Sequence, residues 1–243
     1  MALKNNTTCP SKDCVPIEMK ILIIEMGGLG SILRTTTVSQ ALKSIHKNTH
    51  ITFLTTAYGK GVLEYSKSID SVIPYSESTF PVLLAQEFDV IINYEVNELA
   101  TSLTTLLKGV KKYGFGMNKL GLPYLLNKSA FELYRFQVDD SFRQRNKKSI
   151  QQLLIESVEL PWKKQKYDIS LHNDDDTYVK NFIKSNGIST KRLVGLNIGS
   201  RKIHARKRWP ADYFIQLARK IKNMDNVAPL ILAGPDEAEL IPI

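Results

Sequence analysis

The chain has 243 residues, of which 43% are hydrophobic and 23% are charged. This length allows one large domain or two modest ones, and the apolar content is ample for a packed core, so a disordered chain is not expected. The formal net charge of +9 suggests a negatively charged partner, which leaves nucleic acid, an anionic membrane surface and a phosphorylated small molecule as candidates. No apolar run approaches the ~18 residues that span a bilayer, so any membrane contact is expected to be peripheral.

Cysteine and histidine usage argues against a metal site and for a cytoplasmic protein. Cys9 and Cys14 are the two cysteines, and both lie in a leading segment, 1–18, that carries no charged-then-apolar signal peptide. The four histidines are scattered rather than placed at ligand spacing from the cysteines: His46, His50, His172 and His204. We therefore expect no bound metal.

The first predicted element is a strand at 20–25, whose continuous branched aliphatic residues suit a strand buried on both faces of a parallel sheet. A glycine-rich turn at 26–30 follows, and the apolar spacing beyond it predicts a helix over 32–45. The next predicted elements alternate in kind: a strand at 51–56, a helix near 61–66, a strand at 71–75, a weak helix, a strand at 89–95 and a helix from about Leu99. This alternation is typical of an open doubly wound α/β sheet, in which ligands bind beyond the carboxyl ends of the strands, where the turn at 26–30 lies.

A linker and a second α/β unit are predicted in the rest of the chain. Segment 161–176 follows a helix that ends near Leu160 and combines proline with a basic and an acidic cluster, a composition that suits an interdomain linker. It separates an amino-terminal domain, 19–160, from a carboxyl-terminal domain, 177–243. The predicted elements of the second domain are a helix at 177–186, a strand at 192–199, a helix at 212–222 and a strand at 228–234. Two strands with their helices cannot enclose a doubly wound domain of ordinary size, about 100 to 150 residues, so the second domain is expected to be incomplete.

The turn GGLGSILR does not match the two familiar phosphate loops. A dinucleotide fingerprint would need a small residue where Leu33 stands, and a nucleoside-triphosphatase loop would need an adjacent Gly-Lys-Ser/Thr. Hydride transfer and ATP hydrolysis are therefore disfavoured. Two interpretations remain: the glycines only allow a tight strand-to-helix turn, or backbone N–H groups at the helix N-terminus face an anionic or hydroxylated ligand.

Two further basic segments are candidate binding sites. The stretch GSRKIHARKRWP, 199–210, follows a predicted strand and precedes a helix, which favours a diphosphate clamp over a solvated basic loop. A second cluster interleaves with Phe142 and could be an anionic-acceptor surface, a nucleic-acid patch or a plain soluble face: Arg143, Arg145, Lys147 and Lys148. Nucleic acid is the weakest of these, because no recognised binding module or aromatic stacking platform accompanies the cluster.

Several segments together resemble the bacterial ADP-heptose:lipopolysaccharide heptosyltransferase family. They are MKILIIEMGGLGSILRTTTVSQALK, FDVIINYE, KKYGFG, SFRQRNKKSIQQLL, VGLNIGSRKIHARKRWPADYFIQLARKI and PLILAGPDE, in this order from Lys20 to the end of the chain. The resemblance implies a GT-B architecture of two Rossmann-like domains facing a cleft. It also implies that the amino-terminal domain receives a sugar acceptor and that the carboxyl-terminal domain holds a nucleotide-diphosphate sugar, with inversion at the anomeric carbon and no metal or other cofactor.

The resemblance also implies roles for particular residues of the carboxyl-terminal domain. Lys207 falls on the family's lysine that contacts the donor phosphates, and Gly199 and Ser200 fall near its phosphate-loop positions. Asp236 and Glu237 follow a strand whose end lies near the nucleoside in relatives.

In the amino-terminal domain the resemblance assigns the turn to the acceptor, with Gly28, Gly30 and Arg34 as the expected acceptor-binding residues. Relatives carry an aspartate after Leu-Gly in this turn, and it serves as the general base; this chain has Ser31 there. A serine hydroxyl cannot accept a proton at neutral pH as a carboxylate can, although it can hydrogen-bond an acceptor. If another carboxylate serves as base, Glu95 is the first candidate, because it ends the predicted strand 89–95.

The second departure from the family is length. Relatives continue well beyond the position of Ile243, with an Asp-Ser-Gly segment and a nearby histidine that grips the donor diphosphate, so the resemblance implies a truncated chain. The leading hypothesis is a heptosyltransferase that acts at the inner face of the cytoplasmic membrane on lipopolysaccharide or a related glycan. The alternative is a non-catalytic remnant of a glycosyltransferase.

Overall fold

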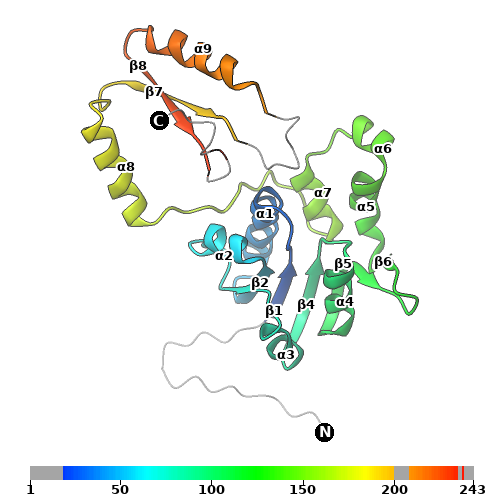
Figure 1. Cartoon of the computed structure of the whole chain (residues 1–243). Helices are drawn as coiled ribbons and strands as arrows, with labels where there is room; N and C mark the ends of the chain where they lie inside the picture. The colour runs from blue at the N-terminus through cyan, green and yellow to red at the C-terminus, as the bar shows by residue number, and fades with distance from the viewer. Residues whose placement is uncertain (1–18, 200–207, 235–236, 238–243) are drawn as a thin grey trace, which may run out of the picture. The chain divides into compact units, whose positions relative to one another are not determined.

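The computed structural model of the protein describes residues 19–199, 208–234 and 237 (Figure 1). The chain divides into two compact units, Met1–Ser170 and Leu171–Ile243. Cys9, Cys14, Ser200, Lys207 and Asp236 lie outside the described residues.

The first unit is built on a six-stranded sheet with the strand order β3-β2-β1-β4-β5-β6. Its strands are β1 (Met19–Ile24), β2 (Thr49–Thr55), β3 (Ser71–Pro74), β4 (Glu87–Asn93), β5 (Lys108–Met117) and β6 (Pro123–Leu125). The first five strands are parallel, and β6 pairs antiparallel with β5. The predicted open parallel α/β sheet is confirmed, and the strand order reverses between β1 and β4.

Helices connect the strands of this sheet and cover it. They are α1 (Leu29–Ile45), α2 (Ala57–Leu63), α3 (Thr79–Leu84), α4 (Glu98–Leu106), α5 (Phe131–Val138), α6 (Asp140–Arg145) and α7 (Ile150–Ser157), with a 3-10 turn at Lys128–Ala130. The segment after α4, which includes KKYGFG, forms the long strand β5.

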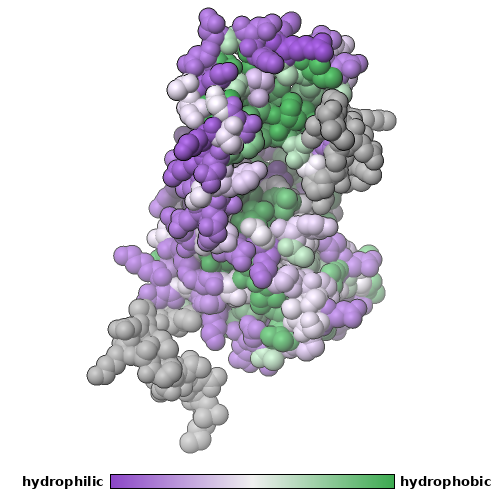
Figure 2. Space-filling view, turned by 60° about the vertical axis from the view of Figure 1, so that its left-hand side comes forward, coloured by the Kyte–Doolittle hydropathy of each residue, from purple (hydrophilic) through white to green (hydrophobic). Residues whose placement is uncertain are grey.

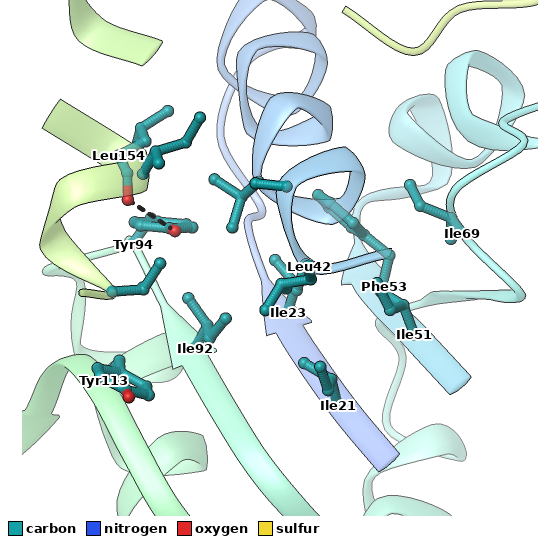
Figure 3. Close-up of a cluster of buried hydrophobic side chains, with 14 of the residues drawn as sticks. Ile21, Ile23, Leu42, Ile51, Phe53, Ile69, Ile92, Tyr94, Tyr113 and Leu154 are labelled. Atoms are coloured by element: carbon teal, nitrogen blue, oxygen red, sulfur yellow. Dashed lines mark hydrogen bonds between the residues drawn. The ribbon is translucent and has the colours of Figure 1, made fainter. Parts of the chain in front are cut away.

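Alternate residues of β1 supply two separate hydrophobic cores. Ile21 and Ile23 pack with residues of α1 and α7 on one face of the sheet, whereas Leu22 and Ile24 pack with residues of α3 and α4 on the other. Figure 3 shows the first of these clusters, with aliphatic side chains of β1, β2 and β4 beneath α1. Because successive side chains of a strand point to opposite faces, a strand covered on both faces must be apolar throughout, which explains the uninterrupted ILII run.

Helix α1 is unusual because it buries hydroxyl side chains as well as aliphatic ones. Thr35, Thr36 and Thr37 are fully buried. The hydroxyl of Thr36 donates to the carbonyl of Leu33 at 2.7 Å, and that of Thr37 donates to the carbonyl of Arg34 at 2.7 Å. Because these local bonds pair the hydroxyl groups, the threonines can be buried against the sheet without leaving unpaired polar groups.

Much of the predicted linker belongs to the first unit. Trp162 packs against its core, and the backbone N–H of Asp168 donates to the hydroxyl of Thr36 at 2.9 Å. The helix predicted at 177–186 begins four residues earlier, because His172 caps it and accepts from the N–H of Asp174 while Asp175 bonds back to the His172 N–H. The acidic residues interpreted as linker are the first turn of this helix, where they complement its dipole.

The second unit contains a parallel pair of strands within its described residues. Its elements are α8 (Asn173–Ser185), β7 (Arg192–Asn197), α9 (Ala211–Lys222) and β8 (Val227–Leu232). Leu196, Ile221 and Ala228 are its buried hydrophobic residues among those described, and α8 buries none of its side chains. Figure 2 shows a green, apolar patch bordered by purple, hydrophilic residues in the upper part of the view.

Candidate active site

A cavity of about 360 Å³ lies in the first unit at the carboxyl ends of β1 and β4. Side chains that follow these two strands line one wall, and residues of α1, α5, α6 and α7 line the rest. The lining residues are Glu25, Gly27, Ser31, Arg34, Tyr94, Glu95, Leu133, Phe136, Gln137, Arg143, Ile150 and Leu154. The cavity therefore lies where the strand order reverses, which is the usual ligand position in open α/β sheets.

The structure places Ser31 and Arg34 together in this cavity. Both belong to the first turns of α1, and the Arg34 guanidinium donates a hydrogen bond of 3.1 Å to the Ser31 hydroxyl. Gly28 is the N-cap of α1 and Gly30 lies within its first turn, but neither lines the cavity; Gly27 does. Ser31 thus presents a hydroxyl held by a cation, which can bind an oxygen-rich ligand.

Two glutamates, Glu25 and Glu95, lie side by side on the cavity wall. Glu25 is 5% exposed, and its carboxylate accepts a hydrogen bond of 3.0 Å from the N–H of Gly27. A methyl group added at Gly27 would lie 2.7 Å from Oε1 of Glu25 and 2.9 Å from Oε1 of Glu95, so the two carboxyl groups meet over this glycine. Burial, followed by the hydrogen bond and the charge of Glu95, raises the pKa of Glu25 well above its ordinary value.

The loop after β4 holds Glu95 in place through two asparagines. The buried Asn93 side chain accepts from the N–H of Glu95 at 2.9 Å and donates to the carbonyl of Phe115 on the neighbouring strand at 2.8 Å. The Asn97 amide donates to Oε2 of Glu95 at 3.0 Å. These bonds fix the carboxyl group of Glu95 relative to the sheet.

Arg143 supplies the second cation of the cavity. Its guanidinium donates to the carbonyls of Phe136 and Gln137, at 3.0 and 2.9 Å, and pairs with Asp140 at 2.9 Å. The other members of its sequence cluster do not line the cavity, and Lys148 bridges two carboxylates of the first unit, those of Glu132 and Glu156. Only Arg143 of that cluster therefore contributes to this candidate site.

In the second unit, Gly199 and Glu237 come together beyond the carboxyl ends of β7 and β8. The Glu237 carboxylate accepts from the N–H of Gly234 at 3.0 Å and pairs with Arg208 at 2.7 Å. A methyl group added at Gly199 would lie 2.7 Å from a Glu237 oxygen, so the carboxylate of Glu237 approaches this glycine closely. Ser200, Lys207 and Asp236, which belong to the same predicted donor site, lie outside the described residues.

A larger cavity of about 570 Å³ lies between α9 and the two strands of the second unit. Its lining is mainly apolar and includes Trp209, whose ring stacks on Tyr213 with 5.4 Å between ring centres. Within the described parts of the chain, no helix is long and apolar enough to cross a membrane. Nor does any group of three or more histidine, cysteine, aspartate or glutamate residues in those parts form a potential metal site.

Sequence comparison decides the family. The profile of glycosyltransferase family 9 (heptosyltransferase) matches residues 78–241, which is more than half of the chain. The chain belongs to this family. Comparison with curated protein sequences gave no significant match.

Solved structures of family 9 proteins share the fold of the chain. A glycosyl transferase family 9 protein from Veillonella parvula is 20% identical with a TM-score of 0.67, and the match covers 92% of this chain and 64% of that one. The E. coli ADP-heptose lps heptosyltransferase II is 13% identical with a TM-score of 0.62, over 91% of this chain and 66% of that one. E. coli heptosyltransferase WaaC, solved with ADP, is 14% identical with a TM-score of 0.55, over 91% and 69% of the two chains.

These likenesses show the GT-B type of α/β fold that the sequence predicted. The chain spans less than two thirds of the length of the first two family 9 structures.

Sequence reasoning did not identify Glu25 as a site residue. The available signal was an acidic residue directly after the apolar run ILII, at the carboxyl end of the first strand. A charged residue at that position lies beside any ligand of a doubly wound sheet. Its contact with Glu95, 70 residues later, could be seen only once the pairing of β1 with β4 was known.

Proposed function

We propose that the protein transfers a sugar from a nucleotide-diphosphate sugar to a hydroxyl group of a glycan. The first unit would receive the acceptor in the cavity at the ends of β1 and β4. The observation that carries this proposal is the position and lining of that cavity in a chain of family 9: two carboxyl groups, a serine hydroxyl and two guanidinium groups face it. Such polar groups suit a hydroxyl-rich ligand, and a carboxyl group suits the removal of its proton.

The second unit would bind the donor. Gly199 and Glu237 lie beyond the ends of two parallel strands, and Gly199 directly precedes the basic segment 200–208 in the sequence. Cationic side chains and backbone N–H groups at such a position stabilise a diphosphate, both when it binds and when it leaves as the nucleoside diphosphate. Lys207 is the proposed principal phosphate contact, and no cofactor would take part.

The identities of the proposed donor and acceptor are taken from the similar solved structures. Two of the similar E. coli structures are heptosyltransferases, and one of them was solved with ADP. We therefore propose ADP-heptose as donor and lipopolysaccharide or a related glycan as acceptor. The net charge of +9 would favour peripheral contact with the anionic inner face of the cytoplasmic membrane.

The experiment that tests this function is a transfer assay with the purified chain. ADP-heptose, UDP-hexoses and GDP-hexoses serve as donors, and deacylated lipopolysaccharide core oligosaccharides serve as acceptors. Mass spectrometry of the acceptor detects transfer, and a coupled assay follows nucleoside diphosphate release. A product heavier by one heptose, formed from ADP-heptose only, supports the proposal; no product from any donor contradicts it.

A second candidate function is binding of a glycan or nucleotide without turnover. The observation that favours it is Ser31, which places a hydroxyl rather than a carboxylate where the family resemblance expects the base. Calorimetric titration of the chain with ADP, UDP and GDP separates the two functions when it is combined with the transfer assay. Binding of a nucleotide without any transfer or donor hydrolysis would favour this second candidate.

A further inference from the structure

The cavity contains a proton-binding group that the family resemblance does not identify. Glu25 and Glu95 are the carboxylic acids among its described lining residues. Their Oε1 atoms lie 2.7 and 2.9 Å from the position that a methyl group on Gly27 would occupy, so the two carboxyl groups approach each other over this glycine. The carboxyl group of Glu95 opposes ionisation of the buried Glu25, which therefore binds its proton more firmly than an ordinary glutamate does.

Hydrogen bonds from neighbouring backbone and side-chain groups fix the positions of both carboxyl groups. The N–H of Gly27 and, at 3.5 Å, the hydroxyl of Thr35 bond the Glu25 carboxylate. The Asn97 side chain bonds that of Glu95, as described above. Glu25 is nearly fully buried but lines the cavity, so a ligand in the cavity can reach its carboxyl group.

The other charged and titratable groups around the pair come from three elements. Arg34 of α1 faces Glu25 and favours its ionised form. Arg143 of α6 lines the same cavity, and the hydroxyl of Tyr94 at the end of β4 points away to the carbonyl of Leu154 at 3.1 Å (Figure 3). The two cations limit the negative charge of the cavity when the carboxyl pair loses its proton.

We propose that the Glu25–Glu95 pair, rather than the residue at position 31, accepts the proton of the acceptor hydroxyl during sugar transfer. This inference rests on the proposed function. In the step, a bond forms between the acceptor oxygen and the anomeric carbon of the donor. The bond between that carbon and the donor phosphate oxygen breaks, and its electron pair leaves with the nucleoside diphosphate. The proton of the acceptor hydroxyl moves to a carboxylate oxygen of the pair and is later released to water.

The environment of the pair suits this task. A general base works best when its pKa is close to the working pH, because it is then ionised and still binds a proton firmly. Burial and the neighbouring Glu95 move the pKa of Glu25 upward, toward that range. The Ser31 hydroxyl, which accepts a hydrogen bond from Arg34, is left to orient the acceptor.

The test compares isosteric variants of the full chain in the transfer assay over a range of pH. The variants are Glu25→Gln, Glu95→Gln, the double variant, and Glu98→Gln as the matched control, since Glu98 is exposed on α4 and does not line the cavity. We expect the double variant to lose about 10²- to 10⁴-fold in turnover, the usual effect of removing a general base. Each single variant should lose less. In Glu95→Gln the pH profile should shift to lower pH, because Glu25 no longer feels the raising effect of Glu95 on its pKa.

Two further measurements separate a chemical role from a structural one. Ser31→Asp in the double variant places a new carboxylate on the same cavity wall and should restore part of the lost turnover. A carboxylate at a different position would not restore turnover if the double variant had lost it through a folding or packing defect. Carboxyl ¹³C NMR of glutamate-labelled protein, without any substrate, should show Glu25 titrating above the ordinary glutamate range in wild type and lower in Glu95→Gln.

The outcomes are distinguishable. Wild-type turnover with an equally active double variant, or a Glu25 resonance that titrates in the ordinary range, overturns this inference and leaves the proposed function standing. Absence of wild-type turnover with every donor overturns the proposed function and the proton-accepting role together. The NMR titration then still decides whether Glu95 raises the pKa of Glu25.

Discussion

The carboxylate of Asp168 accepts hydrogen bonds from both the backbone N–H and the hydroxyl of Ser68, at 2.7 and 2.6 Å. The Ser66 hydroxyl bonds the same carboxylate, which is 6% exposed. Burial opposes ionisation of Asp168, but these hydrogen bonds outweigh it and lower its pKa. The contact ties the end of the first unit to the loop before β3, 100 residues earlier.

Replacing this carboxylate should destabilise the first unit. We expect Asp168→Ala to lower the free energy of unfolding by about 1 to 3 kcal/mol, since three donors lose a charged partner. Because the folded-state pKa is below the unfolded value of about 3.9, the contribution of Asp168 is present above that pH and is lost as the pH falls through the folded-state pKa.

Hydrogen exchange of peptides from the first unit, measured at pH 7 and at about pH 3, below the unfolded-state pKa, checks this expectation. Asp176→Ala is the control, because Asp176 is exposed in the first turn of α8. The difference between wild type and Asp168→Ala should shrink toward acid pH. Equal protection of the two proteins at pH 7 would contradict the assignment.

Gly27 keeps space for the two glutamates of the cavity. In Gly27→Ala the new methyl group would lie within 3 Å of both carboxyl groups, and the ends of these side chains would have to move apart. We expect little change in stability, because carboxyl ends move easily, but a lower pKa of Glu25, since it loses the hydrogen bond of Glu95. Carboxyl ¹³C NMR measures this shift.

Gly30→Ala is the matched control for that substitution. A methyl group at Gly30 meets no atom within 4 Å, so the titration of Glu25 should remain as in wild type. An equal shift of the Glu25 pKa in both variants would mean that any substitution in the turn affects Glu25. The proposed close approach of the two carboxyl groups over Gly27 would then be wrong.

Tyr94 links β4 to α7 inside the first core. Its hydroxyl donates to the carbonyl of Leu154 at 3.1 Å, and burial raises its pKa, so it remains a donor (Figure 3). Tyr94→Phe should lower the free energy of unfolding by about 0.5 to 1.5 kcal/mol, the usual effect of one lost hydrogen bond. Urea unfolding measures it, with Tyr113→Phe as control, because the Tyr113 hydroxyl donates to the half-exposed carboxylate of Glu159. A larger loss in the control would refute the expectation.

Among the residues of the basic segment 200–208, Lys207 is expected to contribute most to donor binding. Lys207→Ala should weaken nucleoside diphosphate binding by about 1 to 3 kcal/mol, the range of a charge-assisted hydrogen bond lost from a partly desolvated site. Lys202→Ala should have a smaller effect. Calorimetry at low salt, with whichever of ADP, UDP and GDP binds wild type, makes the comparison. Equal affinities of wild type and Lys207→Ala would show that Lys207 does not contact the donor.

The second unit should open more easily than the first. Among its described residues it buries few hydrophobic side chains, whereas Trp209, Ile231 and Leu232 are about half exposed. Regions with few buried apolar contacts open at low free energy. Limited proteolysis should therefore cut within 171–243 before it cuts within 19–170. Equal resistance of the two units would contradict this prediction.

The sequence by itself was sufficient for the fold class and for the position of the candidate site in the first unit. Alternation of aliphatic strands with amphipathic helices predicts a doubly wound sheet, because a strand covered on both faces must be apolar at every position. The end of the first such strand is a ligand position in any sheet of this kind, so the turn beside Ser31 could be singled out before the strand order was known. The β5–β6 hairpin was missed, because its short second strand has no alternating pattern of its own.

Only the tertiary structure decided which side chains share the cavity. Glu25 and Glu95 are far apart in the sequence, and the parallel pairing of β1 with β4 brings them together. Arg143 lines the cavity because α5 and α6 position it there, whereas the neighbouring basic residues of its cluster do not line it. The sequence predicts a linker at Asp168, whereas Ser66, Ser68 and Thr36 hold this residue in the first unit. Local sequence patterns report burial and periodicity, but contacts between distant segments depend on strand order, which local patterns do not encode.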